Sequence, residues 1–162
     1  MAILQFKTPE FDPKRAYGFV VEFPEELNIK PYTIQRITKP SVKFTKKEIN
    51  FLNILKYSSL KGKWNNIEIT LFDLIYPSTS AALVNLVEFC DNKKGKKFTF
   101  KIKVLDPVME GSENGVGEVI ETWTIDVHSI VSVDFGKYDY GSKEIQKLKL
   151  ILKPSDCRLN QK

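Results

Sequence analysis

The chain has 162 residues, 42% hydrophobic and 28% charged, which predicts one globular domain and excludes a disordered or collagen-like protein. Its 25 Lys and Arg exceed its 20 Asp and Glu, and the resulting net charge of +5 permits an acidic partner without requiring one. Two cysteines favour assembly inside a cell over a secreted disulfide framework, and no apolar run approaches the roughly 18 residues of a membrane span.

The N-terminal half predicts strands after an arm over residues 1–16. Alternating apolar residues predict strands at 17–23 and 32–38, the second ended by Pro40, which cannot donate to a sheet. Residues 42–56 favour β structure but alternate poorly, and a loop over 58–63 follows. The next strand, 64–72, alternates clearly, with three apolar side chains on one face: Ile67, Ile69 and Leu71.

One helix interrupts the strands. Pro77-Ser78-Thr79-Ser80 supplies a helix start, and apolar residues then recur at helical spacing as far as Cys90. Strict alternation over 98–105 predicts a strand, and residues 106–117 predict an acidic, glycine-rich loop. Two further strands are expected, one with Val119, Trp123, Ile125 and Val127 on a face and one with Val131, Val133 and Phe135.

The last strand places Leu148, Leu150 and Leu152 inward and the lysines between them outward. Short connections between most strands favour antiparallel pairing. The predicted fold is therefore mainly β, an antiparallel β-sandwich or barrel with one packed α-helix, in a single domain.

Charge is divided between two blocks. Residues 30–63 hold nine Lys and Arg and one acid, a net of +8, whereas 104–136 hold seven acids and no Lys or Arg. Such runs are commonly solvated faces, but two opposite blocks in one chain also suit complementary surfaces on neighbouring copies. A nucleic-acid-binding domain would more simply carry the basic block without the acidic one.

No motif indicates catalysis, a metal or a cofactor. His128 is the only histidine, and Cys90 lies on the apolar face of the predicted helix, where a thiol usually acts as a small hydrophobe. Metal-ligand spacing is missing, and Gly62-Lys63 lacks the rest of a phosphate-binding loop. We therefore expect a non-enzymatic protein with no cofactor.

The order of several motifs resembles the tail tube proteins of contractile-tailed bacteriophages and of the related tailocin tubes. Together the motifs span about residues 17–156, and no single one of them is diagnostic. The similar segments are Phe19–Phe23, Ile37–Val42, Lys61–Asp73, Glu121–Asp126, Ile130–Gly136 and Tyr138–Tyr140. The Lys-rich stretch 39–63 and the ending Lys153-Pro154-Ser155-Asp156 depart from the family pattern, so a baseplate-to-tube adaptor of the same fold stays open as an alternative.

The resemblance implies a structural role without enzymatic activity. Proteins of this family form hexameric rings that stack into the hollow inner tube of the tail, through which genomic DNA passes without sequence-specific binding. The partners it implies are further copies of the chain, the tail sheath protein and the baseplate and terminator proteins, with no membrane. The implied location is the virion tail, assembled in the host cytoplasm. A basic β-domain that binds nucleic acid stays open as a third alternative.

The resemblance also suggests how the charge blocks meet. Residues 42–63 correspond to the family's excursion toward the next ring, and we expect its lysines to dock against acids of another subunit. The lysines are Lys43, Lys46, Lys47, Lys56, Lys61 and Lys63, and the acids are Asp106, Glu110, Glu113, Glu118 and Glu121. The channel should present short polar or acidic side chains, because a cationic wall would hold DNA by its phosphates. Lys101 and Lys103 fit that expectation least well.

Overall fold

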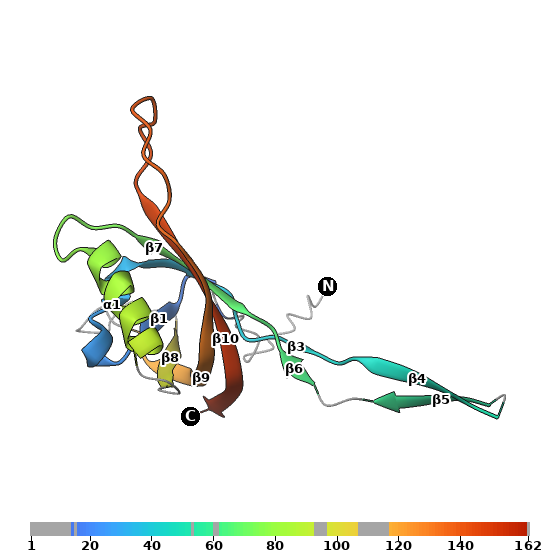
Figure 1. The fold of residues 1–162 in the computed structure, drawn as a ribbon. Coiled ribbons are helices and arrows are strands. Elements are labelled where there is room, and N and C mark those ends of the chain that lie inside the picture. Colours follow the sequence, from blue (N-terminus) through green and yellow to red (C-terminus); the bar gives the residue numbers. More distant parts are fainter. Residues whose placement is uncertain are drawn as a thin grey trace, which may run out of the picture.

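The computed structural model describes residues 14, 16–52, 54–59, 62–92, 97–106 and 117–161. A six-stranded antiparallel sheet, in the order β1-β8-β9-β10-β7-β2, curls into a nearly closed barrel with one helix against it (Figure 1). The predicted fold class is thereby confirmed. Two ribbons, β3-β6 and β4-β5, continue from the sheet as a long projection.

The sheet strands are β1 (Phe19–Glu22), β2 (Ile34–Ile37), β7 (Ile67–Phe72), β8 (Phe98–Leu105), β9 (Val119–Asp134) and β10 (Lys147–Gln161). The projecting ribbons contain β3 (Val42–Lys43), β4 (Lys46–Phe51), β5 (Ile54–Ser59) and β6 (Lys63–Trp64). The helices are α1 (Thr79–Asn92) and two short 3-10 turns, η1 (Glu25–Leu27) and η2 (Pro31–Thr33).

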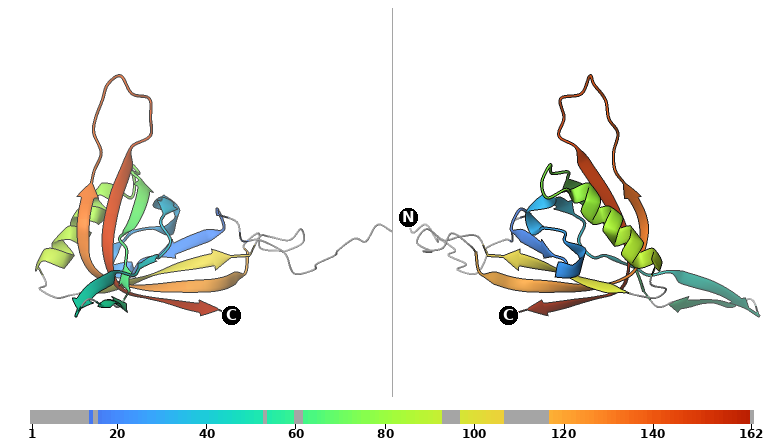
Figure 2. Two further views of the ribbon diagram at one scale, coloured as in Figure 1. Left: turned by 90° about the vertical axis from the view of Figure 1, so that its right-hand side faces the viewer. Right: turned by 60° about the vertical axis from the view of Figure 1, so that its left-hand side comes forward.

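The long strands β9 and β10 each belong to two layers. Their register shifts near Ile151–Leu152 and twice between Lys153 and Asp156, and such β-bulges bend the strands. On one side of the bend, β1 and β8 extend the sheet, and on the other, β7 and β2 extend it. We call these the β8 layer and the β7 layer; Figure 2 shows their different directions.

The core lies between the two layers and α1. The alternation predicted for β7, β8 and the first half of β10 is confirmed, because every second side chain is buried in β7, in β8 and in β10 as far as Pro154. Among the fully buried residues are Phe100, Ile69, Leu71, Ile125, Leu148 and Leu150, with Leu83 and Leu86 from α1. Burial of this apolar surface supplies the main stabilisation of the body.

The start of α1 is held by side chains at its first turn, as the Ser and Thr residues predict. The Asp73 carboxylate accepts hydrogen bonds from the Ser80 N–H at 3.3 Å and the Ser80 hydroxyl at 2.8 Å. The Ser78 hydroxyl oxygen accepts one from the Ala81 N–H at 3.3 Å. These bonds satisfy donors that a helix start leaves unpaired.

Several predicted boundaries are wrong. The two strands expected after residue 119 are one continuous strand, β9, whose register with β10 shifts near its middle. Val131 is 50% exposed, and Phe135, just after the strand, is 41% exposed. Ser58 and Ser59 belong to β5 and not to a loop. Tyr32 and Thr33 form η2, because Pro31 favours the first position of a helical turn. Most of the predicted N-terminal arm and the loop over 107–116 lie outside the described residues.

Candidate assembly surfaces

Both cysteine thiols have raised pKa values. His128 is exposed on β9, and both cysteines are free. Burial raises the pKa of the Cys90 thiol, and burial together with the carboxylates of Asp156 and Asp126 raises the pKa of Cys157 to about 11. A raised pKa keeps a thiol protonated and unreactive.

Over the part of the chain that the structure describes, no three His, Cys, Asp or Glu side chains are grouped as metal ligands would be. The helices described there are also too short or too polar to cross a membrane. The surfaces that stand out in the molecule are instead those suited to contact with other proteins.

The most prominent surface is the projecting hairpin, which we define as residues 42–64. At its base β3 pairs with β6, and farther out β4 pairs with β5 in continuous register from Lys46↔Ser59 to Phe51↔Ile54. The hairpin extends well away from the body (Figure 1). It occupies the stretch of sequence predicted to reach toward a neighbouring ring.

The predicted basic residues are distributed along this hairpin. Lys43, Lys46, Lys47 and Lys63 are exposed on β3, β4 and β6. Lys56 lies on β5 at the position opposite Ile49, and Lys61 falls outside the described residues. The only acid in the hairpin sequence is Glu48, so the hairpin carries a strongly positive net charge.

The hairpin also exposes apolar side chains. Ile49 is 45% exposed, Ile54 59% and Leu52, at the tip, 81%. The register places Ile49 and Ile54 on one face of the ribbon, since Ile49 pairs with Lys56, two residues after Ile54. A lone two-stranded ribbon is at best marginally stable in water, and exposed apolar side chains on such a ribbon are typical of interaction surfaces. The poor alternation of this stretch hid that face from sequence reasoning.

The acidic residues predicted to meet the hairpin do not all lie in one exposed group among the described residues. Asp106 and Glu118 lie at the base of the 107–116 segment, where the Asp106 N–H donates to the Glu118 carbonyl oxygen at 2.8 Å. Glu121 is buried, and its carboxylate forms an ion pair with Lys14 of the same chain. Glu110 and Glu113 lie outside the described residues.

The β8 layer has two open edges. Within the described residues, β1 pairs with β8 alone, and the part of β10 beyond Pro154 pairs with β9 alone. Unpaired edges present free backbone N–H and C=O groups to other strands. Lys101 and Lys103 lie between these edges, on the face of the layer turned away from the core, because they alternate with buried residues of β8.

Neither protein-family models nor curated protein sequences match this chain. Several solved structures, in contrast, are similar to this chain. A chain of the PVC sheath-tube complex, an extracellular contractile injection system in its extended state, has a TM-score of 0.71 at 13% identity over 94% of each chain.

A chain of the 6-fold symmetrised anti-feeding prophage baseplate has a TM-score of 0.67 at 16% identity, over 93% of this chain and 97% of that one. A chain of the anti-feeding prophage tube-terminating cap has a TM-score of 0.68 at 16% identity over the full length of both. The chain therefore has the fold of tube, terminator and baseplate proteins of contractile injection systems, a tail-tube-like fold.

Proposed function

We propose that the chain is the inner-tube subunit of a contractile tail, forming hexameric rings that stack into a hollow tube. The observation that carries this proposal is the four-stranded β8 layer with both edges open, in a fold like those of contractile injection systems. An open antiparallel layer with a long projecting hairpin suits closure into a ring and stacking of one ring on another.

The strand directions support ring closure because they are compatible with it. Each neighbouring pair in the β8 layer is antiparallel, so β10 runs opposite to β1. In a rotationally symmetric ring, the neighbour's β1 has the direction of the subunit's own β1 and can therefore pair antiparallel with β10. Closure of this kind removes both exposed edges at once. Six subunits are proposed from the family resemblance and from the 6-fold symmetry of the similar baseplate.

Stacking of rings is assigned to the hairpin, through its lysines and its apolar face together. Its basic residues would meet the acidic stretch of a subunit in the next ring, at Asp106, Glu110, Glu113 and Glu118. Glu121 is expected to add little, because Lys14 already compensates its charge. A contact between two different surfaces propagates into a filament.

The remaining parts of the proposal follow from the same role. The outside of the tube would contact a sheath, and its two ends a terminator and a baseplate. Genomic DNA would pass through the channel without sequence-specific binding. The subunit would be assembled in the host cytoplasm and function in the virion tail.

A terminal ring is the second candidate. Chains from the tube-terminating cap and the baseplate have TM-scores of 0.68 and 0.67, close to the 0.71 of the sheath-tube chain. A terminal protein would form one ring per particle, whereas a tube protein would form many.

Negative-stain electron microscopy of the purified protein separates these functions. Hollow rods with a regular stack of rings support the tube subunit, and single rings that do not stack support the terminal protein. Monomers that bind DNA in a strongly salt-dependent way would contradict both and favour a nucleic-acid-binding domain.

A further inference from the structure

The face of the β8 layer that is turned away from the core is polar and regular. Register pairs place residues from its four strands in cross-strand rows, one of which is Glu22, Lys101, Thr124 and Arg158. Three further positions of this face are threonines. The members of this face, which we call the polar face, are Val20, Glu22, Thr99, Lys101, Lys103, Thr122, Thr124, Asp126, Asp156, Arg158 and Asn160.

The charges of the polar face cancel. Its three cations, Lys101, Lys103 and Arg158, are matched by three acids, Glu22, Asp126 and Asp156. This balance is local, because the chain carries +5 and the hairpin is strongly basic.

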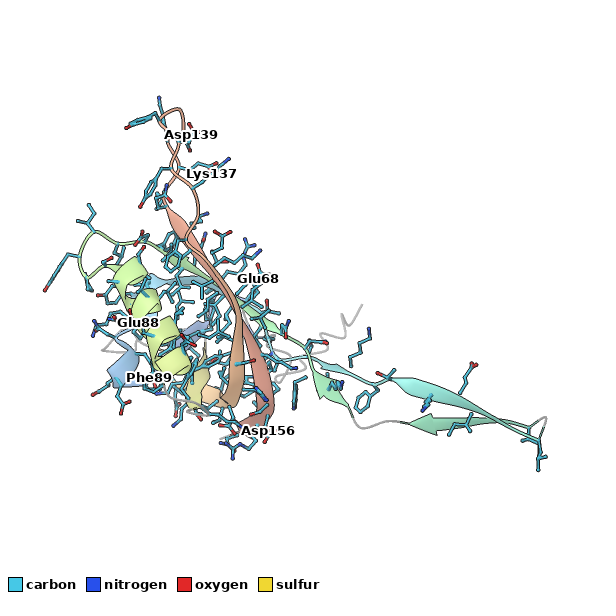
Figure 3. All side chains as sticks on the ribbon, viewed as in Figure 1. Glu68, Glu88, Phe89, Lys137, Asp139 and Asp156 are labelled. Atoms are coloured by element: carbon cyan, nitrogen blue, oxygen red, sulfur yellow. The ribbon has the colours of Figure 1, made fainter. Side chains whose placement is uncertain are left out.

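Most of these charges are also paired in space. The Lys103 ammonium lies 2.7 Å from the Glu22 carboxylate. The Arg158 guanidinium lies 3.0 Å from Asp126 and 3.9 Å from Asp156, and the Thr99 hydroxyl donates to Asp126 at 2.7 Å. Figure 3 shows Asp156 near the free end of β10, far from the hairpin tip.

These ion pairs are expected to contribute little to the folding stability of the subunit. The carboxylate side chains of Glu22, Asp126 and Asp156 keep 43%, 30% and 56% of their exposure. Ion pairs that remain in contact with water contribute little to folding stability. Each pair does bring opposite charges close together on this face.

Resting on the tube function proposed above, we propose that the polar face lines the channel and that its three acids neutralise the wall, so that a polyanionic cargo is not retained. If the β8 layers close into a ring, one face of each packs on its own core and the polar face is the one left for the channel. Without the acids, every ring would present several cations to the cargo at once. Phosphate contacts add up, so the cargo would be held more tightly with each ring.

The test compares variants with the same charge change at different places. Glu22→Gln/Asp126→Asn/Asp156→Asn removes the acids of the polar face. Glu25→Gln/Glu26→Gln/Glu88→Gln removes three exposed acids from η1 and α1, where Figure 3 labels Glu88. Binding of a short fluorescent double-stranded DNA is measured by anisotropy at several salt concentrations. The hairpin lysines contribute equally to both variants, so the difference between them isolates the polar face.

We expect the polar-face variant to bind the DNA at least about tenfold more tightly than the control variant, with a steeper salt dependence. The neutral pair substitution Glu22→Gln/Lys103→Gln should leave the affinity at the wild-type value, which separates charge from a disturbed fold. Equal affinities for the two triple variants would overturn the proposal.

A second measurement tests the position of the face. Lys101→Cys in a Cys90→Ser background is labelled with a maleimide-gold cluster, and the assembled protein is imaged in cross-section. Label inside the channel supports the assignment, and label on the outer wall of an intact ring overturns it while leaving the tube function standing. If no ring forms at all, the tube function fails, and the DNA comparison on subunits still decides whether the acids neutralise the face.

Discussion

The body and the hairpin use the same kinds of residue in opposite ways. In the body, Ile67 and Ile69 are completely buried in β7, whereas Ile49 and Ile54 of the hairpin are 45% and 59% exposed. The core of the body buries its isoleucines within one chain. The hairpin leaves Ile49 and Ile54 exposed, and we propose that another copy covers them together with the hairpin lysines. Substitutions in the two regions should therefore affect different properties of the protein.

The largest effect is expected for Phe100→Ala in the body. Phe100 is fully buried, and its ring stacks on Phe23 with 5.0 Å between the centroids. Loss of the ring leaves a cavity and should lower the free energy of unfolding by about 3–5 kcal/mol. Denaturant unfolding measures this, and a change below about 1 kcal/mol would show that the core is not packed as described.

Charge introduced on the apolar face of the hairpin should impair assembly while leaving the folding stability of the subunit almost unchanged. Ile49→Asp/Ile54→Asp is expected to change the free energy of unfolding of the subunit by less than about 0.5 kcal/mol, because both residues are exposed. The same substitution should abolish stacking, seen as loss of rods in electron micrographs. Ile49→Val/Ile54→Val is the matched control and should assemble normally. Rods of normal length from the Asp variant would remove the apolar face from the interface.

A smaller effect on assembly is expected from charge alone. Lys46→Glu/Lys47→Glu should shorten rods or raise the protein concentration needed to form them, and Lys46→Arg/Lys47→Arg should not. Electrostatic docking also predicts that wild-type assembly weakens as salt increases, since exposed charges are screened. Light scattering across a salt series measures both, and a Glu variant that matches wild type would leave these lysines as a solvated surface.

The smallest effect is expected from experiments that compare the alkylation rate of a cysteine in the body with that of a cysteine in the hairpin. With its pKa near 11, Cys157 should hold about a hundredfold less thiolate at pH 8 than an ordinary thiol, and its alkylation should accelerate as pH rises toward 11. In a Cys90→Ser background, Ile49→Cys should react quickly in the subunit and slowly in rods. Mass spectrometry follows both sites, and a hairpin cysteine that reacts equally fast in rods would argue against its burial.

The strands that could be predicted from the sequence are those in which apolar and polar residues alternate regularly. The strand at 98–105 and the inward leucines of β10 agree with the structure because every second residue faces one core. The helix start at residues 77–80 was predictable because hydroxyl side chains there bond to backbone N–H groups, as Ser78 does. These signals are local, and local patterns can be read without knowing the fold.

The failures have physical causes of a different kind. The bend that joins two predicted strands into β9 depends on bulges in its pairing with β10, and these arise between segments far apart in sequence. The polar face joins Glu22, Asp126 and Arg158 from three strands, a grouping that only register reveals. The pairing of Glu121 with Lys14 was likewise hidden, because a net charge count does not show which acids already have partners.

The central claim is that neighbouring copies close the open edges of the β8 layer, and a cryo-EM map of the assembled protein tests it most directly. The account predicts rings in which β1 of each subunit pairs antiparallel with the free edge of β10, beyond Pro154, in its neighbour. An assembly in which both of these edges face solvent, or a protein that stays monomeric at high concentration, would contradict it.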